Sequence, residues 1–306
     1  MWDIESTPGE NTVSDAKAPI TALLGMKAGM DADILVLGAP FDRKPDVVDG
    51  CVEGPATLRV AGQSLCLQQG HIFLHASREK ALSRLSVSDA GDLVPQPAET
   101  VLEYLARLAM AVRTIASHGK KLLLLGGDHV VTLGALHGLT EIHHDFQVIH
   151  LDAHSDVQDL TPSSLPTNAN FVSYAAELIN THPWIQLGVR AVGRHAPMFP
   201  PNVICTQPEN LAARLQPCVP VYLTIDTDAF DPSLMPAVRY PVPRGLHYDD
   251  LDTILSALCQ ARCPLIGFDW VEFHPSCDMR PGLTAAAILA ALIEILQLLE
   301  KQHSAP

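Results

Sequence analysis

Three segments of the chain combine aspartate and histidine at spacings suited to binding metal ions. They are GGDH, DAHSD and TIDTD, which begin at Gly126, Asp152 and Thr224. In an extended chain, side chains two residues apart point to the same side, so Asp152, His154 and Asp156 would share one face. Asp226 and Asp228 repeat that spacing. A single residue of this kind is usually a helix cap or a loop hydrogen bonder, but three such segments together favour one shared site.

The metal-binding residues that this pattern predicts are His129, Asp152, His154, Asp156, Asp226 and Asp228. Four carboxylates in a partly buried cleft would repel one another, so either their pKa values rise or cations lie among them. Two divalent ions balance four aspartates, and two bridging carboxylates would give each ion four protein ligands and leave room for a shared water molecule. Oxygen ligands with imidazole and without thiolate favour two Mn²⁺ ions over structural zinc, although iron, cobalt or nickel could bind comparably.

Short apolar runs that read as buried strands alternate with helical patterns. The expected strands are ILVLGAP from Ile34, KLLLLGG from Lys121, QVIHLDAH from Gln147, IQLGVR from Ile185, VPVYLTID from Val219 and PLIGFDW from Pro264. The expected helices span Thr100 to Ser117, His247 to Gln260 and Leu283 to Leu299. The alternation predicts a three-layer α/β/α fold with a mostly parallel central sheet. The carboxyl ends of such strands form the ligand-binding edge, where the acidic segments fall.

The chain is expected to divide into a short arm and one domain. Residues 1–30 are rich in proline, glycine, serine and acidic residues, which predicts a flexible N-terminal arm. Residues 31–306 show no internal repeat and no low-complexity linker, so we expect a single α/β domain there. Residues 157–183 are rich in proline, serine, threonine and asparagine, which is typical of an extended loop that walls a binding site.

Composition excludes several classes of partner. The formal net charge is -14 and lysine and arginine form no run, so a small cationic substrate suits the chain better than nucleic acid or an anionic membrane. The apolar C-terminal stretch is shorter than the roughly 20 residues of a membrane span and contains Glu294 and Gln297, which predicts a buried helix. The N-terminus lacks the pattern of a secretory signal and the seven cysteines are scattered, so we expect a cytoplasmic protein with reduced thiols.

The three acidic segments resemble the metal-binding signatures of the ureohydrolase (arginase and agmatinase) family. GGDH, DAHSD and TIDTDAFDP occur in that family's order and at roughly its intervals. Weaker similarities are VEGPATLR from Val52, LGVRAV from Leu187, PVPRGLHYDDL from Pro241 and WVEFHP from Trp270. The resemblance runs from about Ile34 to the C-terminal helix. It implies an arginase-like fold and a manganese-dependent hydrolase that cleaves a guanidino or amidino C–N bond and releases urea.

Carried over by position, the resemblance assigns the ligands to two metals. His129, Asp152, Asp156 and Asp226 would hold one ion, and Asp152, His154, Asp226 and Asp228 would hold the other. Asp152 and Asp226 would then bridge, and the ions would activate a shared water molecule for attack on the planar guanidino carbon. Asp156 would act as a catalytic residue that orients this water molecule. Glu272 matches the family carboxylate that pairs with the guanidinium, since a carboxylate suits that planar, forked cation.

The sequence departs from the family in the loop after DAHSD. Arginases and agmatinases usually carry a histidine there that is assigned to proton transfer, whereas VQDLTPSSLPTNANF contains none. The stretch 168–171 stands in its place, and Gln158 occupies a position that often helps to bind the amino-acid end in arginases. Free L-arginine is therefore not the expected substrate, and another guanidino compound or a peptide arginine is. His274, two residues after Glu272, is the candidate replacement acid, although a purely structural histidine would also fit there.

Three alternatives stay open. Relatives that act on formimidoylglutamate also lack the loop histidine, so a formimidoylglutamase-like hydrolase is one. A catalytically inactive family member that serves as a binding or regulatory subunit is the second. The third is a single-zinc amide deacetylase of related fold, which would need only a subset of the ligands. Family members commonly form trimers or hexamers, so we expect a homo-oligomer whose partner is a small-molecule or peptide guanidino substrate.

Overall fold

The structure is a computed structural model that describes residues 22–42, 50–65, 85–191 and 198–304. Nine strands form one sheet. They are β1 (Lys27–Ala28), β2 (Ile34–Ala39), β3 (Val87–Asp92), β4 (Lys121–Gly126), β5 (Gln147–Leu151), β6 (Trp184–Leu187), β7 (Val203–Thr206), β8 (Val221–Asp226) and β9 (Leu265–Val271). Their order is β1-β3-β2-β4-β9-β8-β5-β6-β7, and every neighbouring pair is parallel.

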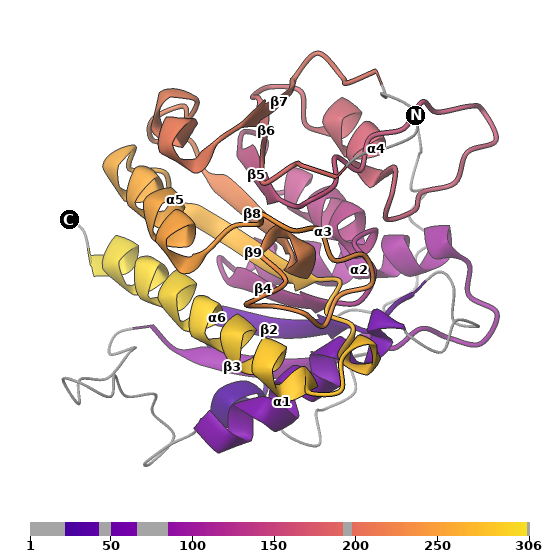
Figure 1. Cartoon of the computed structure of the whole chain (residues 1–306), viewed down its shortest axis with the longest axis vertical. Coiled ribbons are helices and arrows are strands. Elements are labelled where there is room, and N and C mark those ends of the chain that lie inside the picture. The colour runs from indigo at the N-terminus through magenta and orange to yellow at the C-terminus, as the bar shows by residue number, and fades with distance from the viewer. Residues whose placement is uncertain (1–21, 43–49, 66–84, 192–197, 305–306) are drawn as a thin grey trace.

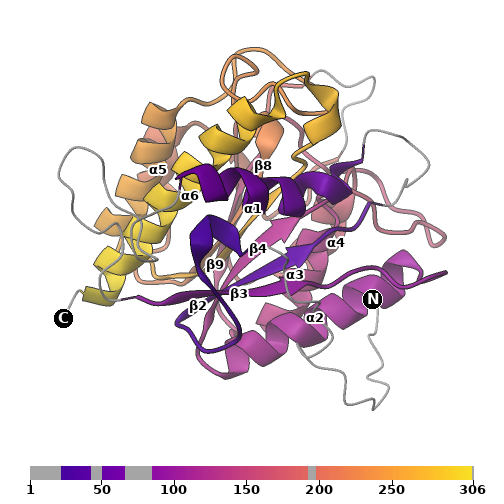
Figure 2. The same ribbon diagram turned by 90° about the horizontal axis from the view of Figure 1, so that it is seen from below.

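Six α-helices cover the two faces of the sheet (Figures 1 and 2). One layer consists of α1 (Gly54–Leu65), α5 (Tyr248–Gln260) and α6 (Pro281–Ser304), and the other of α2 (Val101–Ser117), α3 (Val131–Thr140) and α4 (Phe171–Leu178). Short 3-10 helices connect them: η2 (Leu23–Gly25), η3 (Cys51–Glu53), η4 (Pro208–Ala213), η5 (Thr227–Ala229) and η6 (Pro275–Cys277). The predicted three-layer α/β/α fold is confirmed.

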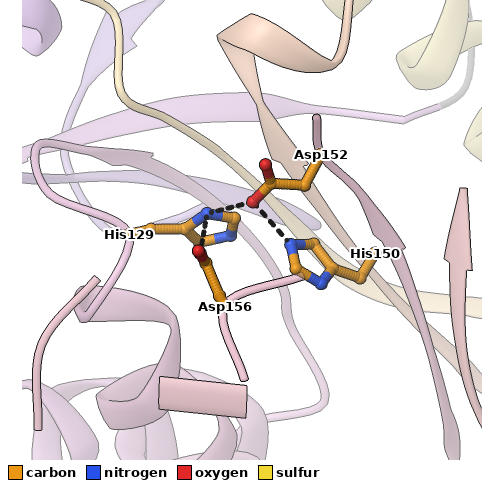
Figure 3. Close-up of side chains that lie close together, drawn as sticks. All are labelled: His129, His150, Asp152 and Asp156. Atoms are coloured by element: carbon orange, nitrogen blue, oxygen red, sulfur yellow. Dashed lines mark hydrogen bonds and ion pairs between the residues drawn. The ribbon is translucent and has the colours of Figure 1, made fainter. Parts of the chain in front are cut away.

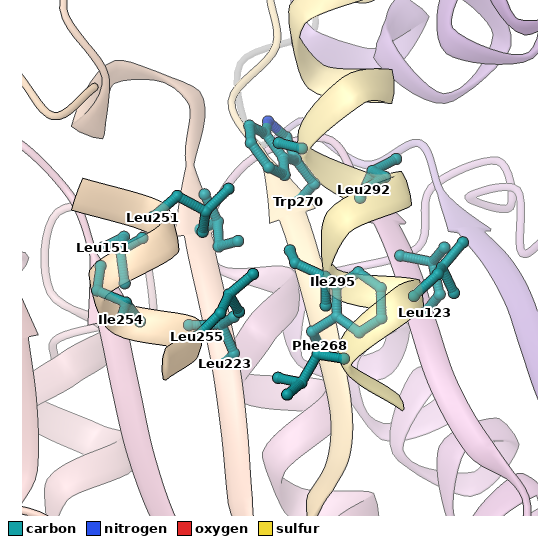
Figure 4. Close-up of a cluster of buried hydrophobic side chains, with 14 of the residues drawn as sticks. Leu123, Leu151, Leu223, Leu251, Ile254, Leu255, Phe268, Trp270, Leu292 and Ile295 are labelled. Carbon is teal, nitrogen blue, oxygen red and sulfur yellow. The ribbon is translucent and has the colours of Figure 1, made fainter. Parts of the chain in front are cut away.

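The two faces of the sheet explain why its central strands are apolar throughout. In β4, Leu123 and Leu125 belong to the core beneath α5 and α6, whereas Leu122 and Leu124 belong to the core beneath α2 and α3. Successive strand residues point to opposite faces, so a strand covered on both sides has no polar face. Figure 4 shows part of the first core, where Phe268 lies close to side chains of the covering helices.

Nine of the fifteen strands and α-helices in the described part of the chain follow from sequence pattern. The six predicted strands are β2, β4, β5, β6, β8 and β9, and the predicted helices are α2, α5 and α6. The remaining strands and helices were not predicted. β3, with sequence VSDAGD, is too polar to read as a buried strand, yet Asp89 is fully buried because Arg59 of α1 donates to both of its oxygens at 2.8 and 2.9 Å. α3 cannot be predicted from periodicity because it is apolar almost all round.

Two expectations about irregular segments are wrong in part. Residues 22–28 belong to the fold rather than to a flexible arm, since Leu23 and Leu24 are buried and β1 pairs with β3. Residues 1–21 lie outside the described residues, and a single domain over residues 31–306 stays a prediction. The stretch 157–183 is not an extended loop throughout, because α4 begins at Phe171 and its apolar residues pack into the core.

The C-terminal helix is longer than its apolar pattern predicted. The stretch Pro281–His303 is long and apolar enough to cross a membrane by length and composition, but 56% of its most apolar window is buried inside the structure. Leu292 and Ile295 pack against the sheet (Figure 4), which is the behaviour predicted for a core helix. Among the described residues, all six cysteines are free, and Cys66 lies outside the described part of the chain.

Candidate metal centre

The acidic and histidine side chains gather where four neighbouring strands end. β4, β9, β8 and β5 lie side by side in the sheet. Their carboxyl ends lead to His129, Glu272, Asp228 and Asp152 respectively. Figure 3 shows three of the predicted ligands, with Asp152 and Asp156 both facing His129. The structure thus brings the three acidic segments to one edge of the sheet.

His129 lies at the centre of a first group of donors. Its Nδ1 atom is 3.2 Å from Asp152 Oδ2, 3.2 Å from Asp226 Oδ2 and 3.5 Å from Asp156 Oδ2. The imidazole of His129 and the carboxylate of Asp152 are fully buried. One nitrogen and three carboxylate oxygens at these separations form a compact donor set for a divalent transition metal.

His154 forms a second group beside the first. Its Nδ1 atom is 3.0 Å from Asp228 Oδ2 and 3.5 Å from Asp152 Oδ1. Asp152 therefore contributes one oxygen to each group, which is the geometry of a bridging carboxylate. Asp226 turns Oδ2 to His129 and accepts the backbone N–H of Asp228 on Oδ1 at 2.8 Å. Neither contact joins Asp226 to His154, so its role as a bridge between the two groups stays a prediction.

A buried chain of hydrogen bonds fixes the orientation of His129. Asp269 is fully buried and accepts the hydroxyl proton of Thr224 at 2.6 Å. Thr224 has then used its only proton, so it must accept the Nε2–H of His129 at 2.9 Å. A neutral His129 consequently directs its Nδ1 lone pair at three aspartates. Such a lone pair is repelled by carboxylate oxygens unless a proton or a cation lies between them, so this donor set fits a metal ion.

His150 is a site residue that the sequence pattern did not single out. Its Nδ1 accepts from Gln186 Nε2 at 2.9 Å, so Nε2 carries the proton and donates to Asp152 Oδ2 at 3.0 Å (Figure 3). Burial lowers the pKa of His150, which keeps the ring neutral. His150 thus orients Asp152 and does not itself present a lone pair to a metal. The sequence signal that could have indicated His150 is its two-residue spacing from Asp152, which is the spacing that singles out His154.

The pKa shifts of the cluster reflect uncompensated negative charge. Burial, followed by repulsion from neighbouring aspartates, raises the pKa of both Asp156 and Asp226 well above the usual carboxyl range. Hydrogen bonds to Asp152 and Asp228 raise the pKa of His154 to about 11. Burial alone would lower the pKa of His129, but the surrounding carboxylates raise it to about 9. Without metal ions, protons on these groups neutralise the negative charge of the cluster. Two divalent cations would supply that positive charge instead.

Glu272 lies next to this cluster and is held on both oxygens. Oε1 accepts the backbone N–H of His129 at 3.0 Å and the side-chain amide of Asn168 at 3.2 Å, and Oε2 is 2.7 Å from Nε2 of His274. Burial would raise the pKa of Glu272, but the bond with His274 contributes most to lowering it. His274 is buried and its imidazole contacts Glu272. Its role as an acid stays a prediction, and a proton from His274 would reach the substrate by way of the Glu272 carboxylate.

Two non-glycine residues of the site have left-handed backbone conformations. The φ angle is 49° at Asp156 and 55° at Glu272. Side chains other than glycine rarely adopt this region, and such residues concentrate at functional sites where the surrounding structure holds them in place. Both predicted catalytic carboxylates are therefore positioned at a conformational cost.

Two adjoining cavities open onto the cluster. One, of about 280 Å³, is lined by His154, Asp156, Asp226, Asp228 and Glu272 among others. The other, of about 460 Å³, is lined by Asp42, Asp128 and His274 among others. Asn168, from the loop after DAHSD, lines both. The predicted role of this loop as a wall of the site is thus confirmed for residue 168.

Comparison with known proteins gives a consistent result. A family model described as "Arginase family" matches residues 32–297. The chain is 31% identical to an agmatinase of Neisseria meningitidis over 87% of each chain, and 28% identical to an N(1)-aminopropylagmatine ureohydrolase of Thermus thermophilus over 85% of this chain and 88% of the relative. The crystal structure of a hypothetical agmatinase from Burkholderia thailandensis has the same fold, with a TM-score of 0.78 and 24% identity over 94% of this chain and 92% of that chain.

Proposed function

The chain belongs to the arginase family, and we propose that it is a binuclear-metal hydrolase that cleaves a C–N bond of a guanidino or amidino group. The observation that carries this proposal is that Asp152 lies between His129 and His154 and joins two adjacent donor groups. Relatives named agmatinase and ureohydrolase support a guanidino substrate and urea as the product.

We propose two Mn²⁺ ions as the cofactor. His129, Asp152, Asp156 and Asp226 would hold one ion, and Asp152, His154, Asp226 and Asp228 would hold the other. Imidazole and carboxylate donors without thiolate support manganese, and two divalent ions match the charge of four aspartates. When bound, the ions would lower the pKa of a water molecule and so provide a nucleophile near neutral pH.

The side chains beyond the ligands would position the reactants. Glu272 would bind the guanidinium through a charge-assisted hydrogen bond, which would hold the planar group beside the metal cluster. Asp156, whose carboxylate reaches the cluster from a strained backbone position, would accept a hydrogen bond from the attacking water and orient it. His274 would keep Glu272 charged and would be the source of the proton that the leaving amine needs.

Urea release tests this proposal directly. Protein purified with Mn²⁺ would be incubated with a panel of alkylguanidines, guanidino acids and arginine-containing peptides, and urea would be measured. We expect activity that a chelator abolishes and Mn²⁺ restores. Asp152→Asn should abolish it and should also reduce the number of ions bound per chain, whereas Asp252→Asn, on the exposed face of α5, should change neither.

The same experiment separates the alternatives. The stretch 168–171 stands where a proton-transferring histidine is expected, and this favours formimidoylglutamate as the second candidate substrate. Its hydrolysis would release formamide instead of urea. Two bound ions per chain with no product from any compound would support an inactive binding or regulatory subunit. One bound zinc per chain with release of acetate from acetylated amines would support the deacetylase.

We further propose that the protein works as a cytoplasmic homo-oligomer, either a trimer or a hexamer. Membership of the arginase family supports this assembly. Light scattering on the eluting peak of a sizing column would give the mass of the particle, and a mass equal to that of one 33.0 kDa chain would exclude the proposal.

A further inference from the structure

Arg239 is a cation without a carboxylate partner at the mouth of an acidic site. It lines both cavities and is half-buried. Within the described part of the chain, no hydrogen bond or ion pair joins its guanidinium to another residue, and its contact is with the ring of Tyr240, whose centroid is 5.5 Å from Cζ. An arginine among so many acidic residues normally finds a carboxylate, so a free guanidinium here is available to a ligand.

Tyr240 contacts both Arg239 and a predicted metal ligand. Its ring centroid is 6.4 Å from that of His154, and the Arg239 guanidinium lies over the same ring at 5.5 Å from its centroid. Tyr240 is 58% exposed, so this pair lies at the surface of the site. Arg239 lines the same cavity as His154, Asp228 and Glu272, so a short substrate held at the cluster has the Arg239 guanidinium within the same cavity.

The two cavities share the residues that would meet the two ends of a substrate. Glu272, Asn168, Ala169, Arg239 and Tyr240 line both cavities. A substrate whose guanidinium is held by Glu272 therefore has Arg239 in the wall of either cavity that its tail enters. An extended guanidino acid with three or four methylene groups spans roughly 6–8 Å from guanidino carbon to carboxylate, so it is small enough to lie within a cavity of about 280 Å³.

We propose that Arg239 binds a carboxylate at the far end of the substrate, so that the enzyme acts on short guanidino or amidino acids in preference to guanidino amines. This proposal rests on the proposed hydrolase function. A carboxylate would pair with the planar guanidinium through two hydrogen bonds, whereas an ammonium group at the same position would be repelled. Asp42 and Asp128 also line the larger cavity and would attract an ammonium instead, so a preference for amines is the outcome that opposes the proposal.

Three substrates of equal length isolate the charge of the tail: 4-guanidinobutanoate, butylguanidine and the guanidino amine agmatine. For the Mn²⁺-loaded protein we expect kcat/KM to fall in that order, with the acid at least about tenfold above the amine. Arg239→Glu should reverse the order, and Arg239→Gln, which removes the charge but keeps a side-chain N–H donor, should bring the three values together. Arg280→Glu makes the same change of charge at an exposed position outside both cavities and should leave the order intact.

Binding of the product tails gives an answer that does not depend on turnover. Calorimetry with 4-aminobutanoate and 1,4-diaminobutane should show tighter binding of the acid to the unsubstituted protein and the reverse for Arg239→Glu. A preference for the diamine, or an acid preference that Arg239→Glu leaves unchanged, would overturn the proposal. Absence of urea from all three substrates would instead overturn the proposed function, and the calorimetric comparison would still decide the role of Arg239.

Discussion

Replacing Thr224 with valine tests whether the buried hydrogen-bond chain prepares His129 for a metal. Valine matches threonine in shape but lacks the hydroxyl that accepts from His129 Nε2 at 2.9 Å and donates to Asp269 at 2.6 Å. The proton on Nε2 would lose its acceptor, and one oxygen of Asp269 would lose a donor. Tyr222 and Thr132 still donate to the other oxygen at 2.8 and 2.9 Å.

Two magnitudes follow from these contacts. A buried donor left without a partner costs about 1–3 kcal/mol. The His129 imidazole and the Asp269 carboxylate are both fully buried, so the free energy of unfolding of the metal-free protein should fall by about that much. The ring also loses the bond that directs its Nδ1 lone pair at the aspartates. Changes to groups that orient a ligand typically weaken metal binding about 10- to 100-fold, and that is the loss expected for Mn²⁺.

Calorimetric titration with Mn²⁺ measures the affinity, and urea denaturation of the metal-free protein measures the stability. Thr224→Ser keeps the hydroxyl and should retain most of the affinity. Thr253→Val removes an exposed hydroxyl on α5 that donates only to a carbonyl of its own helix at 2.8 Å, so it should change neither quantity beyond a few tenths of a kcal/mol. Unaltered Mn²⁺ affinity in Thr224→Val would refute the argument that this chain selects the liganding nitrogen.

Asn168→His should raise kcat on alkylguanidines about tenfold or more, because an imidazole there can deliver a proton to the leaving amine. Asn168→Gln is the control. Equal rates of urea release for the two variants would contradict this reasoning. Arg59→Met leaves Asp89 buried without its cation and should lower the free energy of unfolding by about 3–5 kcal/mol, measured in urea against Arg113→Met, whose ion pair is exposed. Burial lowers the pKa of His137 to about 4, whereas the unfolded chain takes up this proton near 6.5, so stability should decline as the pH falls from 6.5 to 4. His137→Gln should remove up to about 3 kcal/mol of that decline, and an equally steep fall in the variant would count against the assignment.

The metal centre could be predicted from sequence because its ligands are local to motifs at strand ends. Two-residue spacing on an extended chain and the convergence of parallel strands at one edge are enough to bring Asp152, His154 and Asp226 together. The second glycine of the first motif is visible in the sequence, but its cause is not local. A Cβ atom on Gly127 would stand 2.2 Å from the carbonyl oxygen of Phe41, in a distant part of the chain, so only glycine permits this close approach two residues before His129.

The groups that orient these ligands could not be predicted, because their partners are distant in the chain. Thr224 is paired with Asp269 in the register of β8 with β9, and it meets His129 across 95 residues. Thr224 and Asp269 each appear in the sequence as a polar residue within an apolar strand. Only the order and register of the strands, which no local pattern encodes, make them neighbours. The same holds for Gln186 of β6, which reaches His150 of the adjacent β5.

The contacts of the two Glu272 oxygens indicate how the proposed reaction would proceed without the loop histidine. A carboxylate has about four acceptor positions, and three are filled: two on Oε1 by the His129 backbone and the Asn168 amide, and one on Oε2 by His274. Oε1 is therefore committed to the scaffold, and the free position that remains is on Oε2. A substrate N–H bound there shares its acceptor atom with the imidazole of His274. Substrate nitrogen and imidazole would then meet at one oxygen, which would give a short path for the proton that His274 is proposed to supply.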